Sequence, residues 1–155
     1  MTLSNLLSEG QILPSLQATE RWEAIAALVD MLVETEKIAA ADREIVLESI
    51  RQREQTMSTG IGLGIAIPHA STDRVTEVVA AFGRSQAGID FDSLDGNPVH
   101  FIVLFVVPKD QFQTHLRTLS AIAKFLNDPA VRKSLTDAQT ASDIYAVFAQ
   151  RTAQT

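Results

Sequence analysis

The chain contains no cysteine, only one tryptophan and one tyrosine, and fewer basic residues (13 Lys and Arg) than acidic ones (19 Asp and Glu). Without cysteine there can be no disulfide, no thiolate metal site and no cysteine nucleophile. The net charge of −6 disfavours nucleic acid and anionic membrane as partners, because both require a basic surface. The longest apolar run, Phe101 to Pro108, is far too short for membrane insertion.

What the chain does have is the size and apolar content of one globular domain. Its 155 residues are 46% hydrophobic, and a chain of this length buries roughly two-thirds of its unfolded surface. No repeat, linker or low-complexity tract interrupts it, so we expect residues 1–155 to form a single domain. The first ten residues lack the basic start and apolar run of a signal peptide, and we expect a cytoplasmic location.

Predicted strands and helices alternate along the chain. Val99 to Val107 is almost continuously apolar, which is typical of a central strand covered on both faces, and Val75 to Phe82 is a second predicted strand. Capping residues and helical spacing predict helices that begin at Thr19, Asp42, Asp110 (with Gln113 completing a capping box), Pro129 and Thr140. This alternation predicts a sheet between helical layers.

The segment Thr59 to His69 (TGIGLGIAIPH) contains three of the seven glycines, Gly60, Gly62 and Gly64. Bulky residues alternate with small ones along it, which predicts an extended strand with one bulky and one bare face. A bare face indicates that either another backbone or a ligand approaches closely. A P-loop is excluded because no Gly-Lys-Ser/Thr follows, and the dinucleotide-binding pattern fails at Ile65.

The three histidines, His69, His100 and His115, are the next candidates for chemistry. His69 follows Pro68 at the end of the glycine-rich segment, so its backbone is restrained and its imidazole could act as a nucleophile. His115 is expected in the second turn of the helix after Asp110, where the helix dipole favours a nearby anion. From these positions alone, His69 is as readily a surface histidine without a role as a functional one. His115 is equally compatible with a half-buried histidine bonded to the backbone, and His100 is expected to be structural.

Arg53 is the candidate for binding an anion. It shares one face of its predicted helix with Ile45 and Ser49, so its planar guanidinium could point into a pocket and hold a phosphate-like group. The alternative is a stem that packs on the core with its charged end in water.

Taken together, these residues resemble a known family. Arg53-Glu54, Ser58-Thr59-Gly60-Ile61-Gly62, Ala66-Ile67-Pro68-His69 and Thr114-His115-Leu116 resemble the signature of type-2 enzyme IIA domains of the bacterial phosphoenolpyruvate-dependent phosphotransferase system. That family includes fructose–mannitol and nitrogen-regulatory branches. The resemblance covers nearly the whole chain and implies an α/β fold, in which a mixed β-sheet is flanked by helices on both faces. It also implies a phosphotransferase component that acts through a phosphohistidine and uses no cofactor or metal.

The resemblance assigns roles to individual residues. It implies that His69 accepts a phosphoryl group from the phosphohistidine of an HPr-type carrier protein. It implies that His115 is a neighbouring hydrogen-bond donor and that Arg53 stabilises the charge of the phosphoryl oxygens. Thr59 could donate a further hydrogen bond, and the remaining supporting positions are Gly60, Gly62, Gly64 and Pro68.

Three functions are compatible with the sequence. The favoured one is a free-standing nitrogen-regulatory IIA that controls a target protein, since the chain carries no linker and no IIB portion. The second is a sugar-specific IIA that passes phosphate to a IIB domain. Ala70-Ser71, where many relatives have glycine and lysine, leaves the preferred partner open. The third is a non-catalytic module in which His69 and His115 hold a metal or an anion, although no carboxylate has a recognisable ligand spacing.

Overall fold

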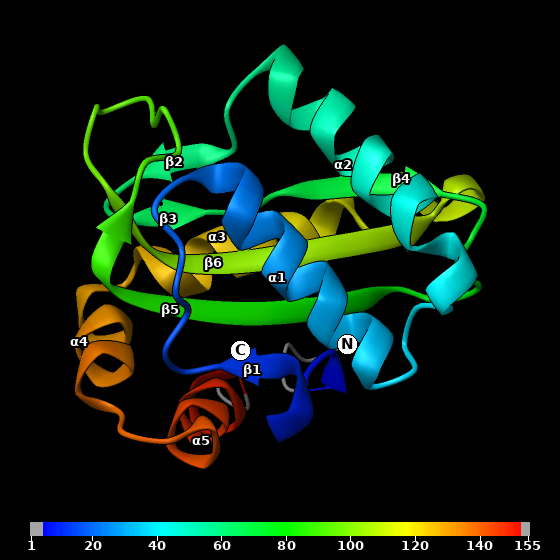
Figure 1. Cartoon of the computed structure of the whole chain (residues 1–155). Helices are drawn as coiled ribbons and strands as arrows, with labels where there is room; N and C mark the ends of the chain where they lie inside the picture. The colour runs from blue at the N-terminus through cyan, green and yellow to red at the C-terminus, as the bar shows by residue number, and fades with distance from the viewer. Residues whose placement is uncertain (1–4, 153–155) are drawn as a thin grey trace.

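The computed structural model describes residues 5–152, without the side chains of residues 151 and 152, as a sheet between two layers of helices (Figure 1). The α-helices are α1 (Arg21–Glu34), α2 (Arg43–Thr56), α3 (Leu116–Asn127), α4 (Pro129–Asp137) and α5 (Ala141–Thr152). The strands are β1 (Ile12–Leu13), β2 (Gly60–Gly62), β3 (Ile65–Ala66), β4 (His69–Thr72), β5 (Val79–Ile89) and β6 (Val99–Pro108). Short 3-10 helices are η2 (Glu9–Gln11), η3 (Ala40–Asp42) and η4 (Lys109–Gln111).

The sheet is mixed, and β6 is its central strand. The strand order is β1-β5-β6-β3-β2, and β4 lies beside β6 next to β3. β6 is antiparallel to β5 and parallel to both β3 and β4. The α/β class, the mixed sheet and the central strand predicted at Val99 to Val107 are therefore confirmed.

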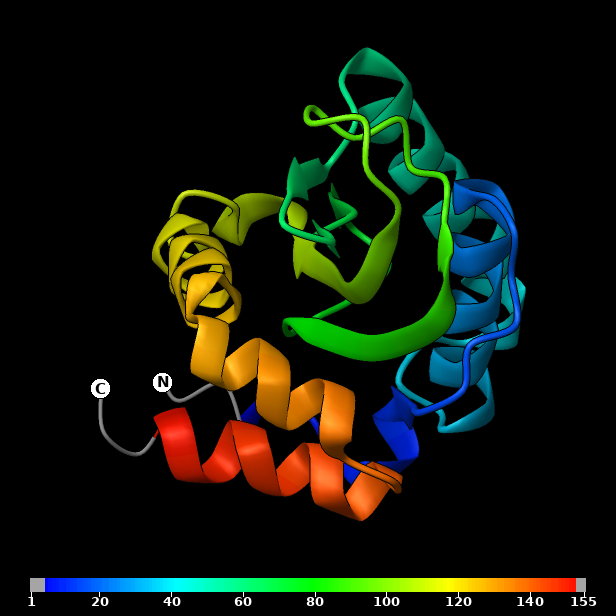
Figure 2. The same cartoon turned by 90° about the vertical axis from the view of Figure 1, so that its left-hand side faces the viewer.

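Two hydrophobic cores lie on opposite faces of this sheet. Successive residues of β6 point to opposite sides. Ile102, Leu104 and Val106 pack in the core under α1 and α2, whereas Phe101, Val103, Phe105 and Val107 pack in the core under α3, α4 and α5. Figure 2 shows these two sets of helices on either side of the sheet. Both faces of β6 are buried, which explains its almost continuous apolar sequence.

The prediction of one extended strand from Thr59 to His69 is wrong. β2 and β3 form an antiparallel hairpin, and Gly62, Leu63 and Gly64 turn the chain with φ angles of +99°, +61° and +78°. The alternation of bulky and small residues cannot reveal this turn, because it includes a leucine in the left-handed region. Leu63 is exposed at the tip of the hairpin, and His69 begins β4 rather than ending a strand.

Several predicted boundaries also move. The N-cap of α1 is Glu20, whose carboxylate accepts hydrogen bonds from the backbone N–H groups of Trp22 and Glu23. The predicted cap, Thr19, instead donates its hydroxyl hydrogen to the side chain of Glu23. Asp42 occupies the N-cap position of α2 but makes no capping hydrogen bond there.

The second half of the chain is predicted more successfully. Asp128 caps α4, which begins at Pro129, and the Thr140 hydroxyl accepts the backbone N–H of Asp143 at 3.1 Å in α5. The capping box at Asp110 is wrong, because η4 and a turn occupy that segment and α3 begins only at Leu116. β5 starts at residue 79, four residues later than predicted. Within residues 5–152, every helix is too short or too polar to cross a membrane.

Candidate functional site

His69 is held at the start of β4 with its two ring nitrogens in different environments. Its Nδ1 lies 2.8 Å from the carbonyl oxygen of Ile67. A carbonyl can only accept a hydrogen bond, so Nδ1 carries the hydrogen and Nε2 of the neutral ring keeps a lone pair. The preceding residue, Pro68, accepts the backbone N–H of Phe105 at 3.0 Å, which fixes the position of β4 along β6.

The surroundings of His69 favour the neutral imidazole. Burial lowers the pKa of His69 below the ordinary value of 6.5, and the positive charge of Arg53 lowers it further. The hydrogen bond to Ile67 and the negative charge of Glu54 act in the opposite direction but do not cancel the shift. A neutral ring near pH 7 is the form that can attack an electrophile.

His115 approaches the same place from the other end of the chain. It is the N-cap residue of α3, not a residue of a second helical turn, and its side chain is buried. Its ring stands edge-on to that of Phe105, with the centroids 6.1 Å apart and an interplanar angle of 75°. Phe105 is also the direct partner of His69 in the parallel pairing of β4 with β6, so both side chains project to one face. The structure therefore gathers His69 and His115 around Phe105.

Arg53 joins this group from the last turn of α2. Its Nη1 donates a hydrogen bond to the carbonyl of Met57, 2.8 Å away, just beyond the end of the helix. Its charge is near enough to His69 to lower the pKa of the imidazole. A partly exposed arginine whose charge reaches an imidazole can bind an incoming anion there.

The backbone and the side chain of Thr59 both donate to one buried carboxylate. Its hydroxyl donates to Oε1 of Glu54 at 2.5 Å, and its backbone N–H donates to Oε2 of the same carboxylate at 2.8 Å. Thr59 is buried, and its hydroxyl hydrogen is directed at Glu54. In this structure the Thr59 hydroxyl is therefore engaged by Glu54, a residue to which the motif assigned no role, and donation from Thr59 to a phosphoryl group stays a prediction.

Glu54 carried a signal that could have identified it. It follows Leu47 by seven residues and Ile50 by four, which places it on the buried face of α2. A carboxylate on that face must be compensated by hydrogen bonds or an ion pair. Its side chain is fully buried, and Oε2 lies 3.5 Å from Nη1 of Arg21.

The three glycines of the hairpin provide close packing. A Cβ atom on Gly60 would lie only 2.4 Å from Oγ of Ser93, and one on Gly62 would lie 3.3 Å from Oδ2 of Asp95. The carbonyl of Gly60 also accepts the backbone N–H of Leu94 at 3.1 Å. Of the two explanations for a bare face, the approach of another segment of the chain is confirmed, because the hairpin lies against residues 92–97. Gly64 packs against the ring of His100.

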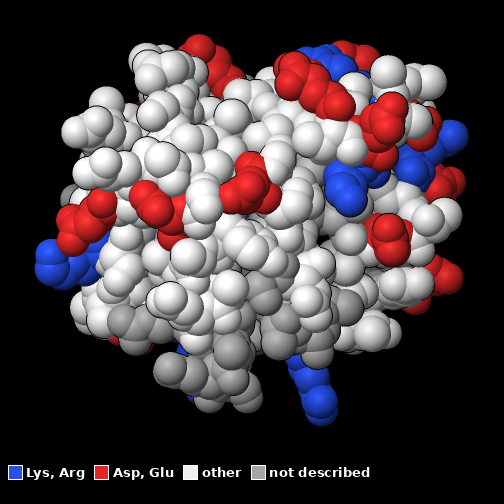
Figure 3. All heavy atoms as spheres, turned by 90° about the horizontal axis from the view of Figure 1, so that it is seen from below, with Lys and Arg blue, Asp and Glu red and all other residues white. Residues whose placement is uncertain are grey.

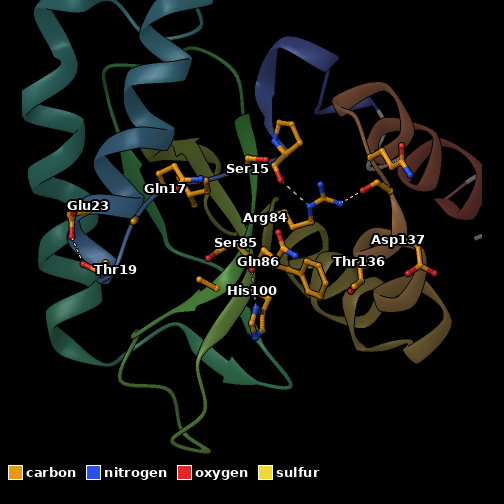
Figure 4. Close-up of a pocket in the computed structure, with 17 residues that line it drawn as sticks. Ser15, Gln17, Thr19, Glu23, Arg84, Ser85, Gln86, His100, Thr136 and Asp137 are labelled. Carbon is orange, nitrogen blue, oxygen red and sulfur yellow. Dashed lines mark hydrogen bonds between the residues drawn. The ribbon is translucent and has the colours of Figure 1, made fainter.

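A separate cavity of 1190 Å³ lies at the other end of the sheet (Figure 4). Arg84 crosses it and donates to the carbonyl groups of Pro14 at 2.9 Å, Leu135 at 2.8 Å and Ala138. These bonds tie the segment after β1 to the C-terminal end of α4. The positive charge of Arg84 lies at the C-terminal end of α4, which is the negative end of the helix dipole. This pairing indicates a structural role for Arg84.

His100 lines this cavity, and its contacts support the prediction that it is structural. Its Nδ1 lies 2.9 Å from the carbonyl of Ser85, so it donates to a segment where the register of β5 against β6 shifts. Phe105, which marks the His69 site, is five residues further along β6, roughly 16 Å at the rise of a strand. None of the predicted site residues His69, His115 and Arg53 lines the cavity.

Possible metal ligands do not cluster among the described residues, and charges of both signs share the surface. Among the described residues, no three His, Cys, Asp or Glu side chains gather where they could hold a metal ion. On the face shown in Figure 3, acidic and basic groups lie near one another and broad areas carry neither.

The arrangement around His69 can now be compared with known proteins. A model of the family described as "Phosphoenolpyruvate-dependent sugar phosphotransferase system, EIIA 2" matches residues 5–151. The chain belongs to this family. The resemblance seen in the Arg53-Glu54, Thr59-Gly60 and Pro68-His69 segments is thereby confirmed for nearly the whole chain.

Relatives within the EIIA 2 family carry two kinds of name. The chain is 36% identical over 150 residues to the PTS system fructose-specific EIIABC component of Bacillus subtilis, covering 97% of this chain but only 23% of that protein. It is 32% identical over 149 residues to the nitrogen regulatory protein of Bradyrhizobium diazoefficiens, covering 96% of this chain and 95% of that protein. The chain thus spans less than a quarter of the first relative and nearly all of the second.

The fold of the EIIA 2 family is also found in solved structures. The crystal structure of the nitrogen regulatory protein IIA-Ntr from Neisseria meningitidis superimposes with a TM-score of 0.84 at 27% identity, covering 94% of this chain and 98% of that one. The mixed sheet between helical layers is therefore the fold of a phosphotransferase-system IIA protein.

Proposed function

We propose that this EIIA 2 protein is a phosphohistidine carrier that accepts a phosphoryl group on Nε2 of His69 from an HPr-type phosphocarrier protein. The observation that carries the proposal is the bond from Nδ1 of His69 to the Ile67 carbonyl, which leaves Nε2 as the nucleophilic nitrogen. Burial and Arg53 support the same chemistry, because they lower the pKa of His69 and keep the ring neutral.

Phosphoryl transfer between two imidazoles needs positioning and charge stabilisation more than covalent assistance. The P–N bond of the donor phosphohistidine breaks while a P–Nε2 bond forms at His69, and the donor imidazole leaves with its electron pair. Arg53 neutralises the oxygens of the transferred group. His115, beside Phe105, supplies a second polar group on the same face of the sheet.

The regulatory branch is the preferred biological role. The nitrogen regulatory relative is matched over 95% of its own length, which supports residues 1–155 as one regulatory domain that acts on a target protein in the cytoplasm. A phosphoryl group adds roughly two negative charges near neutral pH, enough to switch a protein interface. The second candidate, transfer to a IIB domain, is favoured by the 36% identity to a fructose-specific component.

The experiment is phosphorylation by enzyme I, HPr and phosphoenolpyruvate, followed by intact-mass analysis. Wild type and His100→Gln should each gain one acid-labile phosphate, whereas His69→Ala should gain none. His100→Gln is the matched control, because it removes a half-buried histidine whose ring nitrogen likewise bonds a backbone carbonyl. Absence of phosphate on folded wild type, with HPr itself phosphorylated, would contradict the proposal.

A further inference from the structure

We propose that Glu54 is a positioning residue for the His69 site, because its buried carboxylate holds the Thr59 segment against the ends of α2 and α1. This inference rests on the proposed function of His69 and extends it to a residue that does not touch the transferred group. It is carried by the hydrogen bonds, burial and ion pair of Glu54.

The carboxylate of Glu54 joins three separate parts of the chain. It belongs to α2, it accepts both the N–H and the O–H of Thr59, and it forms an ion pair with Arg21 at the start of α1. The guanidinium of Arg21 is itself held over the ring of Trp22, with its Cζ atom 4.5 Å from the ring centroid. Bonding two donors of one residue restrains both the backbone and the side chain of Thr59.

Glu54 lies where fold stability alone disfavours a carboxylate. It is in the last turn of α2, at the negative end of the helix dipole, and its side chain is fully buried. Both conditions raise the free energy of an ionised carboxylate, and replacing a whole buried ion pair by well-packed apolar residues is often neutral or stabilising. A role beside the neighbouring Arg53 accounts for the presence of a charge at this position.

Glu54 and Arg53 exert opposite electrostatic effects on His69. The charge of Arg53 lowers the pKa of the imidazole, and the charge of Glu54 raises it. The other groups around the ring are the Ile67 carbonyl, which accepts from Nδ1, and His115, which reaches the same face through Phe105. Glu54 therefore limits how far the arginine depresses the basicity of the nucleophile while it anchors the segment that follows α2.

The decisive test is an NMR titration of His69 in wild type and in Glu54→Gln. Removing the charge of Glu54 should lower the pKa of His69 further, because the opposing charge of Arg53 remains. Glu48→Gln is the matched control: it removes one carboxylate from the exposed side of the same helix and should leave the titration unchanged. A purely structural Glu54 would alter stability without moving the His69 titration.

Phosphoryl transfer from HPr gives the second measurement. Glu54→Gln should slow the transfer by about tenfold to a hundredfold, the loss expected when a reacting group is misplaced by about 1 Å. A folded Glu54→Gln protein with an unchanged His69 titration and an unchanged rate would overturn the proposal.

A second pair of variants keeps the test decisive if Glu54→Gln does not fold. Thr59→Val removes the hydroxyl donor without changing any charge, and Thr59→Ser retains it. Transfer should be slow in Thr59→Val and close to the wild-type rate in Thr59→Ser, and equal rates in the two variants would overturn the positioning role. If wild type accepts no phosphate from HPr, the proposed function fails, and the His69 titration in Glu54→Gln still tests the electrostatic effect of Glu54.

Discussion

His69 on β4 is the direct parallel partner of Phe105 on β6. The ring of Phe105 meets His115 edge-on, so one aromatic side chain in the core links two histidines that are 46 positions apart in the sequence. The site is thus built on sheet pairing and core packing, which makes its geometry sensitive to substitutions that touch neither reacting group.

Replacement of Phe105 should therefore impair both stability and transfer. Phe105→Ala removes a buried ring and should lower the free energy of unfolding by about 3–5 kcal/mol. Phe105→Leu should cost less but still slow phosphorylation of His69, because the ring that supports His115 is lost. Phe101→Leu is the control, since Phe101 lies on the same face of β6 and stacks on Phe82. Urea denaturation and transfer kinetics measure the two effects, and equal rates for both leucine variants would contradict this account.

Substitution of Arg53 should affect chemistry rather than folding. Arg53→Ala should slow phosphoryl transfer by about 10²- to 10³-fold, the usual cost of removing one group that stabilises transition-state charge. Arg51→Ala, two positions earlier on α2 with only an ion pair to Glu48 in the described structure, should transfer at the wild-type rate. Rapid-quench kinetics of phosphate transfer from HPr compares the variants, and an unchanged rate for Arg53→Ala would remove this residue from the site.

The depressed pKa of His69 also predicts a pH dependence of stability. The unfolded chain binds a proton at this residue near pH 6.5, whereas the folded chain does so only at lower pH. The unfolded state therefore holds more protons between these two values, and the free energy of unfolding should decrease as the pH falls below 6.5. The contribution is complete above that pH. Urea denaturation of wild type and His69→Gln from pH 8 to pH 4 should show a smaller acidic decrease in the variant, and parallel curves would contradict the shift.

The hairpin tip offers a test of backbone strain. Leu63 has a φ of +61° and is 55% exposed, so Leu63→Asn should raise the free energy of unfolding by about 0.5–1 kcal/mol by relieving a left-handed leucine. Leu94→Asn is the control, because Leu94 is 71% exposed and is not among the described residues with positive φ. Thermal or urea denaturation measures both variants, and equal changes would indicate that exposure, not backbone strain, determines the effect.

The sequence correctly predicts those elements that depend on residues close together along the chain. The apolar run of β6, the proline that starts α4 and the Thr140 cap of α5 are all correct, because each depends on residues close together in sequence. The predicted start of the helix at Asp110 is wrong. Asp110 and Gln113 have the spacing of a capping box, but the chain there forms η4 and a turn before α3 begins.

The site was only partly predictable for the same reason. The motif predicts His69, His115 and Arg53 as site residues, but the placement of the two histidines depends on the pairing of β4 with β6 and on the ring of Phe105. The hydrogen bond from the Thr59 hydroxyl to Glu54 was not predicted, because that contact involves the end of a helix and the loop beyond it. Hydrogen-bond direction between such segments is a property of the folded chain, which residue spacing does not encode.

The two-sided burial of β6 has a consequence for how the nucleophile is kept in place. When a strand is apolar on both faces, the difference between a buried and a solvent-exposed face cannot fix its pairing register. Side-chain size does so here, since the core under α3, α4 and α5 receives Phe101 and Phe105 while the opposite core receives only aliphatic groups from this strand. A slip of one residue would exchange rings for smaller groups on both sides at once. The position of the His69 imidazole therefore depends on the difference in side-chain volume between the two cores on either face of β6.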